Sequence, residues 1–181
     1  AASQIVLTGT TGFTITGNQG IQKIQNQNAD DGTISNNQFE CRYGQNCLAL
    51  VTAGGGPFNF QNPADVPNDI NITNNVFANY NTSTGGDFVY LFAGININFA
   101  SNTIRSAVQV DDAFITMLSI GNAQVTLNNN QFFYPEKQSG ETNGIWGLNI
   151  RVDSSDATVS AEHNAFFITS STQSATNGSA C

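Results

Sequence analysis

Apolar and polar residues alternate over short stretches along the whole chain, and Asn, Gly, Ser and Thr separate these stretches. Alternation with a period of two is typical of a β-strand that buries one face, whereas an amphipathic helix repeats about every 3.6 residues. No stretch of helical periodicity interrupts the pattern. The sequence therefore predicts an all-β chain of short strands joined by tight turns.

One short motif recurs, in which an apolar residue is followed by two or three polar residues including Asn and then by another apolar residue. Its copies lie at 34–39, 72–77, 99–104, 127–132 and 161–166, with a weaker copy at 15–21. The last Asn of each copy is Asn18, Asn37, Asn75, Asn102, Asn130 or Asn164, at intervals of 19, 38, 27, 28 and 34 residues. Such variable intervals favour the coils of a solenoid whose connecting loops differ in length.

A further apolar strand is predicted in the intervals between motifs, at 48–53, 88–93, 113–120 and 145–152. Each coil then consists of a strand, a tight Asn turn, a strand, a loop and a third strand. A β-sandwich also uses short strands and Asn-rich turns, but it has no reason to repeat one motif about every 30 residues. We therefore predict a solenoid of about six coils.

The Asn residues of the motif suit a sharp turn that repeats from coil to coil. Asn tolerates left-handed backbone angles, and its amide can hydrogen-bond to the Asn of a neighbouring coil. We expect the six side chains to form a ladder. The apolar residues on either side are expected to form two inward columns, Ile34, Ile72, Phe99 and Leu127 in one and Phe39, Phe77, Ile104, Phe132 and Phe166 in the other.

The motifs at 34–39 (Ile-Ser-Asn-Asn-Gln-Phe) and 72–77 (Ile-Thr-Asn-Asn-Val-Phe) resemble those of the right-handed parallel β-helix, or pectin-lyase-like, superfamily. The resemblance is closest to the adhesin-type repeats of bacterial surface and autotransporter proteins, and it covers about residues 13–168. It implies a right-handed parallel β-helix with Asn-ladder turns. It does not imply one function, because the same coil occurs in pectate lyases, phage tailspikes, adhesins and inert stalks.

Charged residues make up only 10% of the chain, and the formal net charge is −8. The five basic residues are scattered, which excludes nucleic acid as a partner bound through its phosphates. No apolar run reaches the length of about 18 residues that a membrane-spanning helix requires. The start, Ala1-Ala2-Ser3, is typical of a chain cut by signal peptidase, so we expect a secreted protein at the cell surface.

The chain has three cysteines, Cys41, Cys47 and Cys181. Cys41 and Cys47 are close enough in sequence for a local disulfide, which leaves Cys181 for a bond to another molecule. The alternative is that two of the cysteines are small buried apolar residues and the third has no partner. A zinc site is not expected, because the chain has no CxxC motif and its one histidine is His163, which we expect to replace an Asn in the turn ladder.

Catalysis on carbohydrate would require acidic side chains gathered on one face. Asp87, Asp111 and Asp112 precede strands of neighbouring predicted coils, and Arg105 is the basic residue nearest to them. In pectate-lyase-like enzymes such residues bind calcium or transfer protons, so this set is the candidate catalytic and calcium site. The alternative, which we favour, is that these Asp residues have no catalytic role and flank strands because Asp is common in turns. No other cofactor is expected.

The chain is expected to form one domain over 1–181, with coils at 13–168 and a polar tail at 169–181. The segment 1–12 contains the apolar strand residues Ile5, Val6 and Leu7, and we expect it to be an N-terminal strand or a polymerisation segment. No amphipathic helix is evident that would cap either end. We therefore expect an extracellular structural or adhesive protein that stacks end to end, with itself or a cell-surface glycan as partner. The alternatives are a β-helix enzyme or tailspike-like glycan binder, and a fragment of a longer adhesin.

Overall fold

The computed structural model describes residues 4–41, 46–51, 66–79, 89–91, 94–106, 113–119, 124–134, 146–152 and 158–168. These residues form strands and turns, and no helix occurs among them. The strands are β1 (Gln4–Thr8), β2 (Thr14–Thr16), β3 (Gln19–Ile21), β4 (Lys23–Gln27), β5 (Gly32–Ser35), β6 (Gln38–Cys41), β7 (Leu48–Val51), β8 (Asn68–Thr73), β9 (Val76–Asn79), β10 (Val89–Leu91), β11 (Ile95–Ala100), β12 (Thr103–Ser106), β13 (Ala113–Ser119), β14 (Gln124–Asn128), β15 (Gln131–Tyr134), β16 (Trp146–Val152), β17 (Thr158–Glu162) and β18 (Ala165–Ile168).

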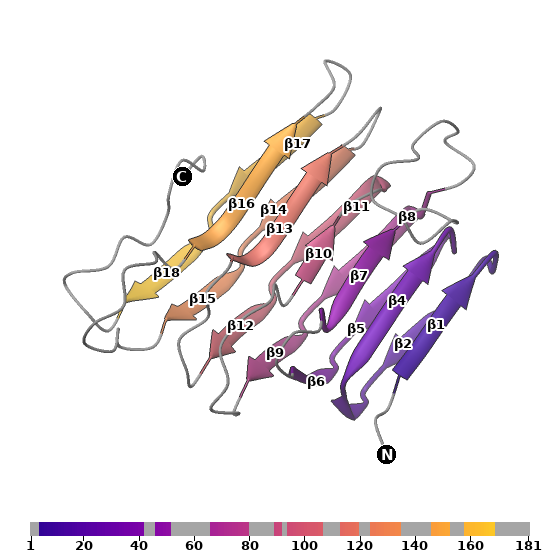
Figure 1. Ribbon diagram of the computed structural model, residues 1–181, viewed down its shortest axis with the longest axis horizontal. Coiled ribbons are helices and arrows are strands. Elements are labelled where there is room, and N and C mark those ends of the chain that lie inside the picture. Colours follow the sequence, from indigo (N-terminus) through magenta and orange to yellow (C-terminus); the bar gives the residue numbers. More distant parts are fainter. Residues whose placement is uncertain are drawn as a thin grey trace.

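The strands form three parallel sheets of six strands each, and successive strands enter the three sheets in rotation. Sheet 1 has the order β1-β4-β7-β10-β13-β16, sheet 2 the order β2-β5-β8-β11-β14-β17, and sheet 3 the order β3-β6-β9-β12-β15-β18. We call one strand from each sheet a rung, so the first rung is β1 to β3 and the last is β16 to β18. Figure 1 shows the rungs side by side from the indigo end of the chain to the yellow end. The prediction of an all-β chain with stacked strands is confirmed, and the arrangement is compatible with a solenoid.

Two columns of apolar side chains fill the interior beside the motif. In sheet 2, Ile34 aligns with Ile72, Phe99 and Leu127, and in sheet 3, Phe39 aligns with Phe77, Ile104 and Phe132. All eight side chains are fully buried. The rings of Phe39 and Phe77 stack with their centroids 4.4 Å apart. Both predicted columns are confirmed, and burial of each Phe contributes about 1.5–3 kcal/mol to folding.

Sheet 1 closes the core from the third side. Val89 and Leu91 of β10 point inward and are buried, while Tyr90 points outward and packs against Ala49 and Val51. Val89 aligns with Leu48 of β7, which also lies in the core, and this register sets the orientation.

The turn between sheets 2 and 3 uses two adjacent residues for two different purposes. The first has a left-handed backbone with φ near +55° to +70°; it is Gly17, Asn36, Asn74, Ser101, Asn129 or His163. The second is the motif Asn whose side chain points into the turn. His163 therefore occupies the bend itself, where it is exposed, and Asn164 is the ladder residue of that rung.

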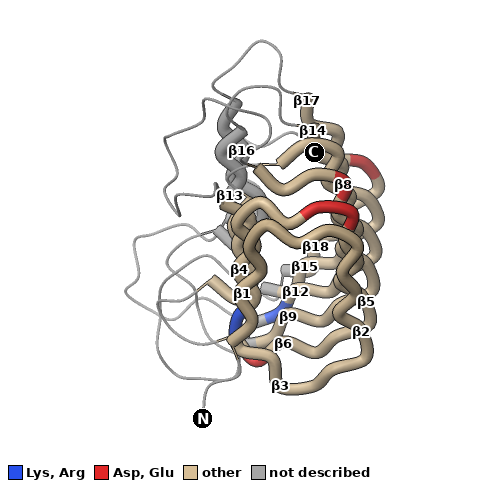
Figure 2. Tube along the Cα trace, turned by 90° about the vertical axis from the view of Figure 1, so that its right-hand side faces the viewer, with Lys and Arg blue, Asp and Glu red and all other residues tan. Residues whose placement is uncertain are grey.

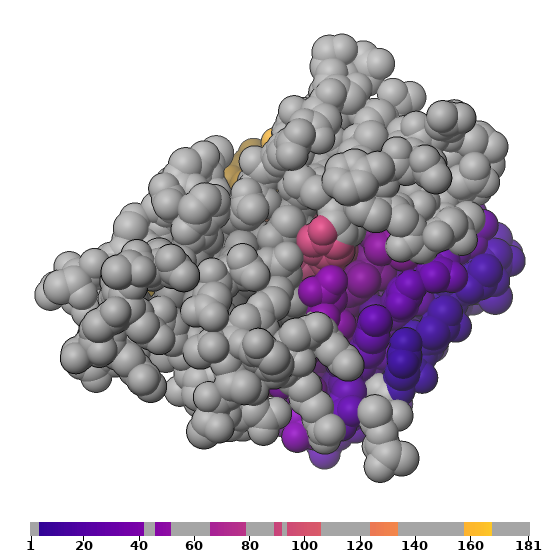
Figure 3. Space-filling view, in the orientation of Figure 1, coloured from indigo at the N-terminus to yellow at the C-terminus, as the bar shows by residue number. Residues whose placement is uncertain are grey.

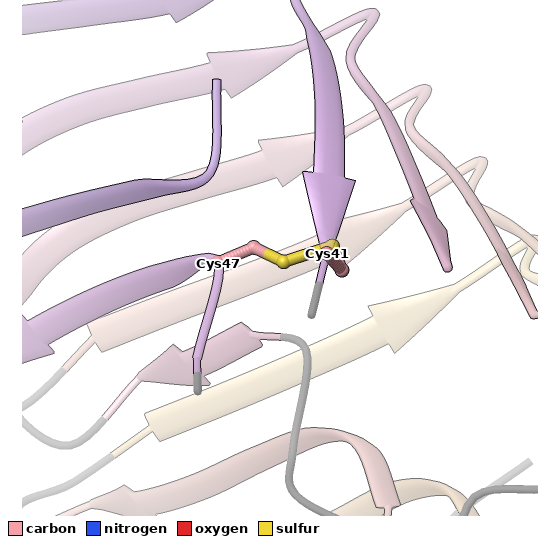
Figure 4. The surroundings of a disulfide bond; sticks show 2 residues. All are labelled: Cys41 and Cys47. Atoms are coloured by element: carbon pink, nitrogen blue, oxygen red, sulfur yellow. A yellow bond between two sulfur atoms is a disulfide. The ribbon is translucent and has the colours of Figure 1, made fainter. Parts of the chain in front are cut away.

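Cys41 and Cys47 form a disulfide that joins the end of β6 to the start of β7 (Figure 4). Both residues are fully buried and belong to the main core cluster. The bond therefore fixes one corner between sheet 3 and sheet 1 and leaves no thiol of this pair available. Cys181 lies outside the described residues.

A test of the first corner of the fold is the substitution Gly32→Ala. A Cβ atom at Gly32 would lie 2.0 Å from Cζ of Phe13, whose ring covers the glycine. We expect a loss of about 1–3 kcal/mol in the free energy of unfolding, because the ring must leave its site. Urea denaturation measures this, and the loss should shrink when Phe13→Leu is also present. If Gly32→Ala lowered the free energy of unfolding equally with Phe and with Leu at position 13, the clash with the Phe13 ring would not be the cause.

Replacing both bonded cysteines, as in Cys41→Ala with Cys47→Ala, should lower the free energy of unfolding by about 2 kcal/mol, because the unfolded chain regains the entropy of a short loop. The far-ultraviolet circular dichroism spectrum should stay that of a β protein. Thermal denaturation with and without reductant provides the comparison, since reductant should destabilise the parent chain and leave the variant unchanged.

Candidate functional site

The six motif Asn side chains hydrogen-bond to one another from the first rung to the last. Nδ2 of Asn18 donates to Oδ1 of Asn37 at 3.0 Å, and Asn37 donates to Asn75 at 3.1 Å. The same contact joins Asn75 to Asn102, Asn102 to Asn130 and Asn130 to Asn164, at 3.1, 3.2 and 2.9 Å. In the five Asn that follow Asn18, Oδ1 also accepts the backbone N–H of the preceding ladder Asn at 2.9–3.0 Å. We call this set the Asn ladder.

The second N–H of each amide reaches backwards to a main-chain carbonyl of the preceding rung. Asn75 donates to the carbonyl of Ile34, Asn102 to that of Ile72, and Asn130 to that of Phe99, at 2.9–3.0 Å. An interior ladder Asn therefore uses both donors and its acceptor. Asn18 differs, because its amide donates to the carbonyl of Thr16 within its own turn.

Burial raises the importance of these bonds. Asn37, Asn75, Asn102 and Asn130 are almost fully buried, whereas Asn18 is exposed and Asn164 is half-buried. A buried amide without hydrogen-bond partners costs about 1–3 kcal/mol per unpaired group, and here every group is paired. The ladder carries no charge, nucleophile or ionisable group, so what it supplies is alignment of rungs rather than catalysis.

A second set of side-chain hydrogen bonds lies at the corner between sheets 1 and 2. Oδ1 of Asp30 accepts from the backbone N–H of Asn68 at 2.9 Å and from its Nδ2 at 3.2 Å. Asn26 is fully buried and caps the corner through the N–H and the carbonyl of Ala29. We did not predict this set, although Asp30 and Asn68 each lie seven residues before a ladder Asn (37 − 30 and 75 − 68).

Most of the predicted catalytic and calcium site lies outside the described part of the chain, so the site stays a prediction. Asp87, Asp111 and Asp112 lie outside the described residues. Arg105 is exposed on sheet 3, where it aligns with Ala78 and Phe133. Among the described residues, no three His, Cys, Asp or Glu side chains gather in a way that would hold a metal ion.

The outer face of sheet 3 carries a short aromatic column next to Arg105. The rings of Phe133 and Phe167 stack with their centroids 4.5 Å apart and an angle of 7° between their planes. Phe167 is 46% exposed and lies on β18, at the edge of the sheet. One face of its ring therefore meets Phe133, and the opposite side faces the end of the stack of rungs.

The outer face of sheet 2 is polar and almost uncharged along its central column. This column consists of Thr14, Thr33, Asn71, Asn98, Thr126 and Ser160. Neighbouring side chains bond across rungs on this face, as between Asn71 and Asn98 at 3.1 Å and between Thr16 and Ser35 at 3.2 Å. Figure 2 shows how few of the described residues are charged.

Among the described strands, those of the first and last rungs pair on one edge only. We call these two ends the N-rim (β1, β2 and β3) and the C-rim (β16, β17 and β18). Val6 on β1 is 52% exposed. Figure 3 shows the first strands at the surface of one end of the molecule, in indigo. The core columns are also less covered at the rims. Ile15, in the sheet 2 column at the N-rim, and Phe166, in the sheet 3 column at the C-rim, are half-buried, whereas the column residues of the middle rungs are fully buried.

Comparison with protein-family models, curated proteins and solved structures finds no match for this chain. Among the described residues, no helix is long and apolar enough to cross a membrane.

The ladder predicts that removing a buried amide lowers the free energy of unfolding more than removing an exposed one. Asn102→Ala removes four hydrogen bonds and leaves two N–H groups of Asn75 unpaired inside the protein. We expect a loss of about 3 kcal/mol or more in the free energy of unfolding. At the exposed end, Asn18→Ala should cost about 1 kcal/mol or less.

Urea denaturation of the two variants tests this gradient. Asn71→Ala is the matched control, because Asn71 is exposed on the outer face of a middle rung, and its loss should stay within about 0.5 kcal/mol. Similar losses of unfolding free energy at positions 102, 18 and 71 would contradict a stabilising role for the buried ladder amides.

Proposed function

We propose that this chain is a right-handed parallel β-helix that serves as an extracellular structural or adhesive protein and assembles end to end into filaments. The Asn ladder is the observation that carries the proposal. It runs through all six rungs, and its interior groups are saturated by internal contacts. A protein organised around such a contact is suited to persist rather than to bind and release a substrate.

The handedness is part of the proposal and rests on a general rule. A connection that leaves a parallel strand and returns to the same sheet is right-handed in nearly all known proteins. Each path from β1 through β2 and β3 to β4 is such a connection. The resemblance of the motifs to those of right-handed parallel β-helices agrees with this rule.

The surface and the disulfide support an extracellular location. Disulfides persist in oxidising compartments, and the Cys41–Cys47 bond is buried where reductants reach it slowly. Polar neutral residues replace charge on the outer face of sheet 2, which leaves few Lys and Arg side chains as protease sites. Both features suit a protein exposed to the medium.

Negative-stain electron microscopy across a concentration series tests the proposal, with and without reductant. We expect ordered filaments one molecule wide above a threshold concentration, together with resistance to trypsin at 37 °C for hours. Loss of filaments in the variant Cys181→Ser, without reductant, would assign Cys181 a role in the junction, whereas loss in reductant alone would reflect reduction of the Cys41–Cys47 bond. Discrete monomers at every concentration would overturn the filament, and rapid proteolysis would overturn the structural role.

A further inference from the structure

We infer that the C-rim of one copy of this chain binds the N-rim of a second copy by extending the Asn ladder, with Asn164 of the first copy donating to Asn18 of the second. This inference rests on the proposed end-to-end assembly and specifies its partner, direction and register. It follows from the polarity of the ladder, which leaves a different chemical group at each end.

The hydrogen-bond pattern shows what each rim offers. In every interior step, the N–H and Nδ2 of one ladder Asn donate to Oδ1 of the Asn in the following rung. At the C-rim, Nδ2 of Asn164 donates backwards to the carbonyl of Leu127, and among the described residues nothing accepts from its backbone N–H. At the N-rim, Oδ1 of Asn18 has no donor among the described residues. The C-rim thus offers donors, and the N-rim offers the matching acceptor.

The amide of Asn18 indicates the same direction. Interior ladder residues donate backwards to the carbonyl three residues before the preceding ladder Asn, as Asn130 does to Phe99. With no preceding rung among the described residues, Asn18 donates instead to Thr16. In a head-to-tail pair the equivalent acceptor is the carbonyl of Ala161 in the other copy, so this amide would regain the interior pattern.

The apolar columns continue in the same register. Aligning Asn164 with Asn18 places Phe166 next to Ile21 of the second copy, and Ala161 next to Ile15. Val159 then meets Phe13. Apart from Ile21, these side chains are half-buried and pack against the core of their own chain on one side. Contact with a second copy would bury them as fully as the columns of the middle rungs, which is the main source of free energy for such a junction.

Head-to-head pairing is disfavoured by the same groups. Two N-rims would bring two Oδ1 acceptors of Asn18 together with no donor between them, and two C-rims would oppose donors. An interface between unlike surfaces repeats without closing, so the contact generates a filament with a direction.

Cysteine cross-linking tests the direction and the register. In the extended ladder Ser160 of one copy aligns with Thr14 of the next, just as Thr126 aligns with Ser160 and Thr14 with Thr33 within the chain. Paired strands lie about 4.8 Å apart, which a disulfide can span. We would prepare Thr14→Cys and Ser160→Cys as separate proteins, each with Cys181→Ser, and oxidise them alone and mixed with diamide.

The mixture should give a covalent dimer on a non-reducing gel, and each protein alone should stay monomeric on the gel. Thr158→Cys replaces Ser160→Cys as the register control and should cross-link to Thr14→Cys at least about fivefold less, because it lies two residues, or about 7 Å, along the strand. Dimers of Thr14→Cys alone, or equal yields with the control, would overturn the inference.

Sedimentation velocity of the unsubstituted chain distinguishes failure of the proposed junction from failure of the proposed filament. Assembly without the specific cross-link would overturn the junction while the proposed filament stands. Absence of assembly at every concentration would overturn both. As a further arm, Asn18→Ala should raise the concentration for half-assembly about tenfold or more, through loss of the shared acceptor, whereas Asn71→Ala should leave it unchanged.

Discussion

The register of the structure depends on one constraint, which is that a buried amide at each turn must find hydrogen-bond partners. Asn75 and Asn102 lie in the interior, where water cannot replace a missing partner. The groups within reach of each side chain belong to the rungs on either side, so satisfying the amide requires that neighbouring turns lie in register. Once the turns are aligned, β8 and β11 pair before the turn, and β9 and β12 pair after it. The Ile and Phe columns follow from that alignment.

The same constraint explains which residues the turn accepts. The left-handed position is occupied by Gly, Asn, Ser and His, since it requires only a backbone angle and an exposed side chain. The ladder position is Asn in all six rungs. Asp lacks the donors, Ser and Thr lack a second donor, and Gln places its amide one methylene too far from the backbone. Only Asn offers two donors and an acceptor at this distance.

This division shows what the sequence could predict and what it could not. Turn positions and both inward columns follow from the spacing of Asn and apolar residues, because packing and hydrogen bonding impose that spacing on every rung. The roles of Asn36 and Asn37 could not be distinguished from one motif, since two adjacent Asn look equivalent until Ser101-Asn102 and His163-Asn164 are superposed on them. Among the described residues, the contact between Asp30 and Asn68 joins two rungs, and two positions are too few to stand out in an Asn-rich chain. The predicted acidic site stays a prediction, because its three Asp residues lie outside the described residues.

A ladder also solves a problem that sheet edges alone leave open. The main-chain groups at the edge of a parallel sheet are nearly the same at every residue, so two edges can pair in many registers. An Asn amide that donates on one side and accepts on the other favours one register and one direction, because a shift by one residue leaves a buried donor unpaired. The contact that aligns rungs within this chain therefore has the two properties that a directional contact between copies requires. The contact between neighbouring rungs and the proposed contact between copies then use the same hydrogen bonds and apolar columns. A change that weakens the contact between rungs should therefore also weaken the contact between copies.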